Sequence, residues 1–120
     1  MGDAENLDPG SVAEICDHVE RARMTLAIVR TPNAPQQLRP VFESVASACS
    51  LPLVRTIFSP LSDFGFAEFN SNGKMLVMLF IGGTRTELVS VSETDEIAVR
   101  DLEDSVSSSN IQSSTIRDGL

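Results

Sequence analysis

Residues 63–70 alternate aromatic and small side chains, and this pattern restricts the fold more than any other segment of the chain. Successive side chains of a β-strand point to opposite faces of a sheet. A strand here places Phe64, Phe66 and Glu68 on one face. The other face carries two small residues and Phe69, which suits close packing against helices. The paired aromatic rings on the first face predict either a bound partner or a covering segment, because exposed apolar patches are usually used.

Two helices are predicted from apolar side chains at helical spacing. The first, at 11–22, begins with a capping box at Ser11, and the second covers 34–48. The apolar stripes are Val12, Ile15, Cys16 and Val19 in the first helix and Leu38, Val41, Phe42, Val45 and Ala46 in the second. Pro40 lies within the second stripe, and a proline inside a helix costs about 3 kcal/mol. Either the first turn of that helix is irregular or the regular helix begins near Arg39.

Further strands are predicted from β-branched or alternating segments at 24–31, 51–58 and 86–92. The apolar run at 75–81 has two interpretations. It fits a strand that pairs with 63–70 through a turn at Asn72 and Gly73. It also fits a short buried helix that ends at Gly82, because periodicity cannot distinguish the two in a fully apolar run.

The charge of the chain is concentrated in two acidic arms. The 120 residues carry a formal net charge of −8. The arm 1–23 has two Arg against six Asp and Glu, and the arm 93–120 has two Arg against seven. The middle, 24–92, has a net charge of +1, so the acidic arms do not exclude nucleic-acid binding by this part. We therefore predict one domain at 24–92, preceded by helix 11–22 and followed by a partly unfolded, Ser-rich tail. A short helix in the tail has its apolar stripe at Val99, Leu102 and Val106.

The sequence predicts no enzyme, metal site, cofactor or membrane anchor. His18 has no recognisable nucleophile beside it, and the triplet that begins at Cys16 lacks the ligands for a closed zinc site. Cys16 and Cys49 make no disulfide framework, so we expect a reducing, intracellular location in the nucleus or cytoplasm. No apolar run approaches the ~18–20 residues of a membrane helix, and the acidic start does not read as a signal peptide.

Segment 63–70 resembles the octamer of the RNA-recognition motif (RRM) family, Lys/Arg-Gly-Phe/Tyr-Gly/Ala-Phe-Val-x-Phe/Tyr. The matching positions are Phe64, Gly65, Phe66 and Phe69, with Ala67 as a near match. Ser62 and Asp63 stand in place of the basic residue and the first glycine. The predicted elements over 24–92 also follow the family's β-α-β-β-α-β order. The resemblance implies an α+β domain with a four-stranded antiparallel sheet, and it makes 72–82 a helix.

The resemblance also implies that the sheet face binds single-stranded RNA. The implied RNA-binding residues are Phe64, Phe66, Arg30, Arg55, Glu68 and Ala27. The two Phe rings would stack on neighbouring bases, and the two Arg side chains would neutralise phosphate or hold a base edge. Ala27 occupies the position of the family's third stacking aromatic, so we expect modest affinity.

Two other functions fit the same sequence. In the first, the domain is a protein-interaction module of a ribonucleoprotein or RNA-processing complex, its sheet face covered by the helix at 10–23 or 94–106. Its partner would bind the helical face or the acidic arms. In the second, the acidic arms mimic nucleic acid and close the sheet until a partner removes them, which gates RNA binding.

Overall fold

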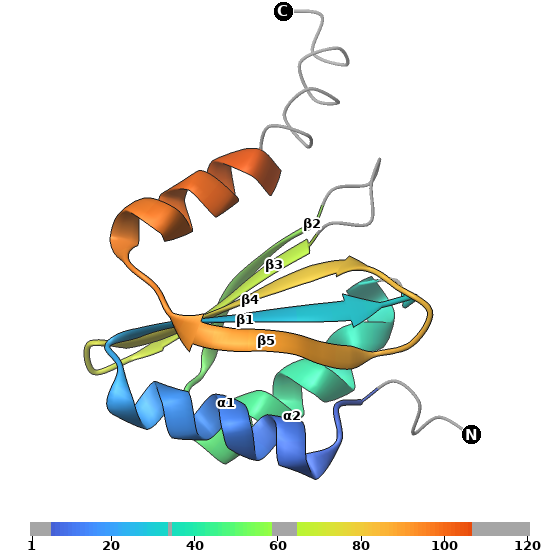
Figure 1. Ribbon diagram of the computed structural model, residues 1–120, viewed down its shortest axis with the longest axis horizontal. Coiled ribbons are helices and arrows are strands. Elements are labelled where there is room, and N and C mark those ends of the chain that lie inside the picture. Colours follow the sequence, from blue (N-terminus) through green and yellow to red (C-terminus); the bar gives the residue numbers. More distant parts are fainter. Residues whose placement is uncertain (1–5, 34, 59–64, 107–120) are drawn as a thin grey trace, which may run out of the picture.

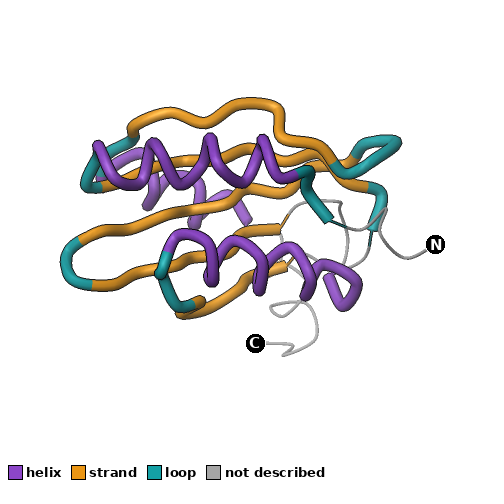
Figure 2. The backbone as a smooth tube through the Cα atoms, turned by 90° about the horizontal axis from the view of Figure 1, so that it is seen from below, coloured by secondary structure: helices purple, strands orange, loops and turns teal. Residues whose placement is uncertain are grey.

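The chain folds into one β-sheet with helices on both faces (Figure 1). The computed structural model describes residues 6–33, 35–58 and 65–106. Helices α1 (Pro9–Arg21) and α2 (Arg39–Cys49) lie side by side on one face, as the view from below shows (Figure 2). Helix 96–106 lies on the opposite face. The predicted α+β class is therefore confirmed.

The sheet is mixed, with its five strands in the order β2-β3-β4-β1-β5. The strands are β1 (Met24–Thr31), β2 (Leu53–Phe58), β3 (Gly65–Ser71), β4 (Lys74–Gly82) and β5 (Glu87–Glu93). β1 pairs with β4 in parallel, and the other three neighbouring pairs are antiparallel. It follows that β1, β2 and β4 run in one direction and β3 and β5 in the other.

Strand β4 replaces the helix that the family resemblance implied for 72–82. Ser71 pairs with Lys74, so the β3–β4 hairpin has two central residues, Asn72 (φ 53°) and Gly73 (φ 81°). Positive φ at both positions is what a type I′ hairpin turn requires. The strand lacks alternation because helices cover it on both faces. The four-stranded antiparallel sheet and the RRM topology are thus wrong, since the additional strand is β4 and it pairs in parallel with β1.

The two faces of β3 are those that the alternation predicted. Ala67 and Phe69 point into the main core under α1 and α2, whereas Phe66 points to the other side of the sheet. The main core has an aromatic centre with ring centroids 5.6 to 6.4 Å apart, formed by Phe42, Phe58, Phe69 and Phe80. A Cβ at Gly65 would overlap the Phe58 ring, so this packing needs glycine.

Local side-chain chemistry sets where the helices begin. α1 begins at Pro9, two residues before the predicted start, because Asp8 is its N-cap. The Asp8 carboxylate accepts hydrogen bonds from the Ser11 hydroxyl (2.7 Å) and the Ser11 N–H (3.1 Å), which lower the pKa of Asp8. α2 begins at Arg39 after a 3₁₀ turn, η2 (Pro35–Leu38). Pro40 therefore lies in the first turn, where proline is tolerated. This confirms the interpretation in which the regular helix begins near Arg39.

A disulfide joins the two helices of the main layer. Cys16 of α1 and Cys49 of α2 form the bond, with their Cα atoms 5.0 Å apart. The expectation that the two cysteines stay unbridged is wrong, because spacing along the chain does not reveal which helix faces will meet. Among the described helices, none has the length and apolar character needed to cross a membrane.

Candidate interaction site on the sheet face

The sheet face that points away from α1 and α2, which we term the second face, is apolar. Its apolar side chains come from four adjacent strands and are Met24, Leu26, Ile57, Phe66, Met75, Val77 and Leu79. Six of these seven are aliphatic or thioether side chains, and Phe66 supplies the single ring. Such a surface offers dispersion contact and apolar burial to a partner rather than a row of stacking platforms.

Helix 96–106 lies over the second face (Figure 1). Its Val99 and Val106 are 5% and 3% exposed, and Leu102 packs partly buried beside them. Asp95 caps the start of the helix by accepting a hydrogen bond from the Ala98 N–H at 2.9 Å. Because Phe66 is fully buried, its ring is enclosed by the protein and is not open to a nucleic-acid base in this conformation.

A charged cluster at the β2 edge of the second face ties helix 96–106 to the sheet. Arg55 Nε donates to Glu68 Oε1 on the neighbouring strand at 3.1 Å. Arg55 Nη2 also forms an ion pair with Glu103 of the helix. The side chains of Glu68 and Glu103 are 12% and 21% exposed, whereas that of Arg55 is 48% exposed. One guanidinium therefore serves two largely buried carboxylates, a geometry that its planar fork of donors allows.

The residues predicted to bind RNA do not form one site. Ala27 is fully buried on the face toward α1 and α2, opposite the second face. Arg30 pairs with Glu87 of β5 at 3.7 Å, and two strands separate β1 from β2. The backbones of the two strands that carry Arg30 and Arg55 are therefore about 14 Å apart across the sheet. Phe64 lies outside the described residues. The predicted residues that cluster are Phe66, Arg55 and Glu68.

Sequence reasoning missed Glu103 and the contribution of β4. Glu103 follows Val99 by four residues and precedes Val106 by three, so it lies on the same helical stripe. A carboxylate within an apolar stripe signals a cation on the surface that the stripe contacts. β4 contributes Met75, Val77 and Leu79 to the second face. Their role was missed because the family resemblance assigned this apolar segment to a helix.

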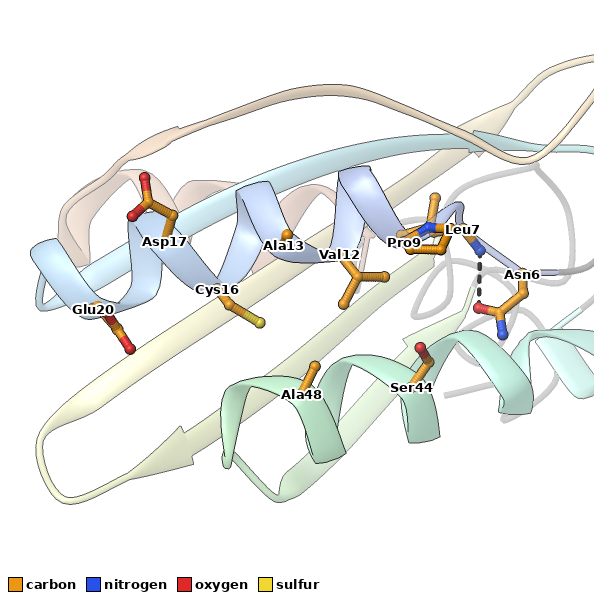
Figure 3. Close-up of a pocket in the computed structure, with 10 residues that line it drawn as sticks. All are labelled: Asn6, Leu7, Pro9, Val12, Ala13, Cys16, Asp17, Glu20, Ser44 and Ala48. Atoms are coloured by element: carbon orange, nitrogen blue, oxygen red, sulfur yellow. Dashed lines mark hydrogen bonds between the residues drawn. The ribbon is translucent and has the colours of Figure 1, made fainter.

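A separate feature is a groove of about 640 Å³ between α1 and α2 (Figure 3). Val12 and Cys16 point toward α2, and Ser44 and Ala48 line the other wall. Cys16 is already engaged in the disulfide. Across 6–33, 35–58 and 65–106, no group of His, Cys, Asp and Glu side chains is placed to hold a metal ion. The groove therefore offers no metal site among the described residues, and the second face, whose apolar side chains already hold a helix, is the stronger candidate.

Comparisons of the chain with protein-family models, curated proteins and solved structures find no match. The RRM resemblance therefore remains an expectation from the sequence, and the sheet order departs from it. The second face and its covering helix are the features of this chain that bear on its function.

Proposed function

We propose that the chain is a protein-interaction module whose second face binds an amphipathic helix of a partner protein. The observation that supports the proposal is that an apolar face of seven side chains already holds a helix, 96–106. Helix-in-groove recognition uses apolar anchors at helical spacing, which Val99, Leu102 and Val106 illustrate on this face. In the free chain this helix acts as an intramolecular ligand that keeps the apolar face from water.

The covering helix is suited to exchange because, within the described residues, a small set of side chains attaches it to the sheet. Three apolar side chains and the ion pair of Glu103 with Arg55 attach it to the sheet. By contrast, β1, β3 and β4 are each paired on both sides within the sheet. Elements with few buried contacts open at lower free energy than the body of a domain. A partner helix that binds the same face more tightly would take the place of helix 96–106.

Single-stranded RNA is a second candidate for the same face, favoured by the proximity of Phe66, Arg55 and Glu68. It requires helix 96–106 to leave so that the Phe66 ring becomes exposed, which is the gating by an acidic arm considered from the sequence. The engagement of Arg55 by two carboxylates weighs against it. The intracellular location and RNA-processing role remain predictions, and the Cys16–Cys49 disulfide favours an oxidising compartment instead.

The proposal is tested by displacing helix 96–106 from the second face in the full chain. The double substitution Val99→Asp and Val106→Asp puts charge at two buried anchors. A fluorescent peptide with the sequence of residues 94–106 should then bind at least about tenfold more tightly than it binds the unchanged chain. The reason is that the native helix competes at the high effective concentration of a tethered ligand. Fluorescence polarisation gives both affinities.

Ile97→Asp is the matched control, because Ile97 lies on the same helix but is 74% exposed. This variant should bind the peptide as weakly as the unchanged chain does. A parallel titration uses a labelled, mixed-sequence single-stranded RNA. Binding of RNA but not of peptide by the opened variant would favour the RNA candidate. Binding of neither, with a native circular dichroism spectrum, would reject both functions.

A further inference from the structure

The covering helix carries one carboxylate on the stripe that faces the sheet. Val99, Leu102, Glu103 and Val106 occupy positions i, i+3, i+4 and i+7, which share one side of a helix. The other acidic side chains of the helix are exposed; they are Glu96, Asp101 and Asp104. A buried carboxylate is costly unless a cation and hydrogen bonds compensate it. Glu103, which is 21% exposed, therefore marks a position at which a cation of the sheet, the Arg55 guanidinium, compensates its charge.

Arg55 supplies that compensation from a side chain that is already oriented. Glu68 accepts from Arg55 Nε at 3.1 Å and is 12% exposed, so a nearly buried carboxylate on the sheet holds one side of the guanidinium. The Nη2 end is then directed to Glu103. Because Glu68 belongs to the sheet and not to the helix, this orientation does not depend on the helix that is bound. Preorganised donors lose less entropy when they bind a ligand.

We propose that Arg55 selects which helices the second face accepts, an inference that rests on the proposed function. The accepted partner is an amphipathic helix with apolar residues at i, i+3 and i+7 and a Glu at i+4. A helix with Lys or Arg at i+4 is rejected, because that cation would lie next to the Arg55 guanidinium at the β2 edge. The partner would also have to bury its own charge where the Glu68 carboxylate is already paired with Arg55. Specificity then arises from repulsion of wrong partners as well as attraction of the right one. Arg55 is thus a specificity-determining residue of this face.

The test uses three peptides on the full chain opened by Val99→Asp and Val106→Asp. The peptides have the sequence of residues 94–106 unchanged, with Glu103→Lys, or with Asp104→Lys. The last two have equal net charge, and they differ in whether the changed residue faces the sheet or the solvent. We expect Glu103→Lys to weaken binding about fivefold, the fold-change of a favourable ion pair, and Asp104→Lys to change it less than about twofold.

Charge reversal on the protein should reverse the preference. With Arg55→Glu added, the Glu103→Lys peptide should bind more tightly than the unchanged peptide, while Asp104→Lys should again have little effect. If the Glu103→Lys and Asp104→Lys peptides bind equally to both proteins, selection by Arg55 is wrong while helix binding by the second face stands. If none of the peptides binds, the proposed function fails together with the inference.

A second measurement needs no opened variant. In the otherwise unchanged chain, Arg55→Glu should speed amide hydrogen exchange in helix 96–106 about fivefold without changing β4. Adding Glu103→Arg should restore slow exchange, because the ion pair is re-formed with its charges exchanged. Unchanged exchange in Arg55→Glu would overturn the role of Arg55, even if the opened variant failed to fold.

Discussion

Two threonines of β1 differ in what their hydroxyl groups do for the fold. Thr25 is fully buried, and its Oγ1 has no hydrogen-bond partner within the part of the chain that the structure describes. Thr31 is 6% exposed, and its hydroxyl lies 2.8 Å from the Thr86 hydroxyl while accepting from the Asn33 N–H at 3.1 Å. A buried polar group without a partner destabilises the folded state, whereas a satisfied one contributes to it.

We therefore expect the same substitution to act in opposite directions at the two positions. Thr25→Val should raise the free energy of unfolding by about 1–2 kcal/mol, because a methyl replaces an unsatisfied hydroxyl. Thr31→Val should lower it by a similar amount, since Thr86 and Asn33 lose a partner. Both changes keep a β-branched side chain, so strand propensity is constant. Urea unfolding of the two variants checks this, and a change of the same sign in both would contradict it.

At the scale of elements, the β3–β4 hairpin fastens α1 as well as completing the sheet. Lys74, the first residue of β4, donates from Nζ to the carbonyl of Val19 at 3.0 Å and to that of Glu20 at 2.6 Å. Both carbonyls belong to the last turn of α1, where the helix dipole is negative. The turn at Asn72 and Gly73 thus positions a cation at a helix end.

Lys74→Met tests this contact. The change keeps an unbranched apolar stem and removes the charge and the donors, so we expect the free energy of unfolding to fall by about 1 kcal/mol. Arg85→Met is the control, because the Arg85 side chain is 78% exposed and pairs only with the nearby Glu87 in the described residues. An equal effect of the two substitutions in thermal unfolding would show that Lys74 contributes no cap.

What could be predicted at this scale depended on whether the signal was local. The faces of β3 followed from alternation alone, and the stripe of Val99, Leu102 and Val106 located helix 96–106. The apolar run at 75–81 has no periodicity, so the choice between strand and helix was made from the family resemblance. That choice, a helix, was wrong. The Arg55–Glu103 pair and the Cys16–Cys49 bond join segments far apart in the chain. No local pattern contains such contacts, because the packing of whole elements creates them.

For the whole molecule, the disulfide is the covalent link within the helical layer. It closes a loop between residues 33 apart in sequence, and the loop contains β1 and nearly all of α2. In the chain-entropy account a cross-link stabilises the fold by restricting the unfolded chain. Since α1 also shields the main core, a bond that holds α1 to α2 supports the packing of the entire sheet face.

Reduction of this bond should lower the free energy of unfolding by about 3–4 kcal/mol, the chain-entropy value for a loop of this size. Urea unfolding with and without dithiothreitol measures the difference. Cys16→Ser should show the lower stability in both conditions, because it cannot form the bond. If the unchanged chain unfolds at the same urea concentration with and without reductant, the disulfide contributes nothing to stability.

The parallel pairing of β1 with β4 also bears on how the molecule is made. Both neighbours of β1 in the sheet, β4 and β5, follow it in the chain, and 42 residues separate Thr31 from Lys74. At a synthesis rate of ~5–20 residues per second, β1 emerges from the ribosome roughly 2–8 s before its first neighbour. During this delay the backbone N–H and C=O groups along both edges of β1 are unpaired, and its side chains are largely apolar and β-branched, a combination that is prone to aggregate. Among the five strands, β1 therefore waits longest for a partner during synthesis, so it is the segment of the nascent chain at which we expect a chaperone to bind.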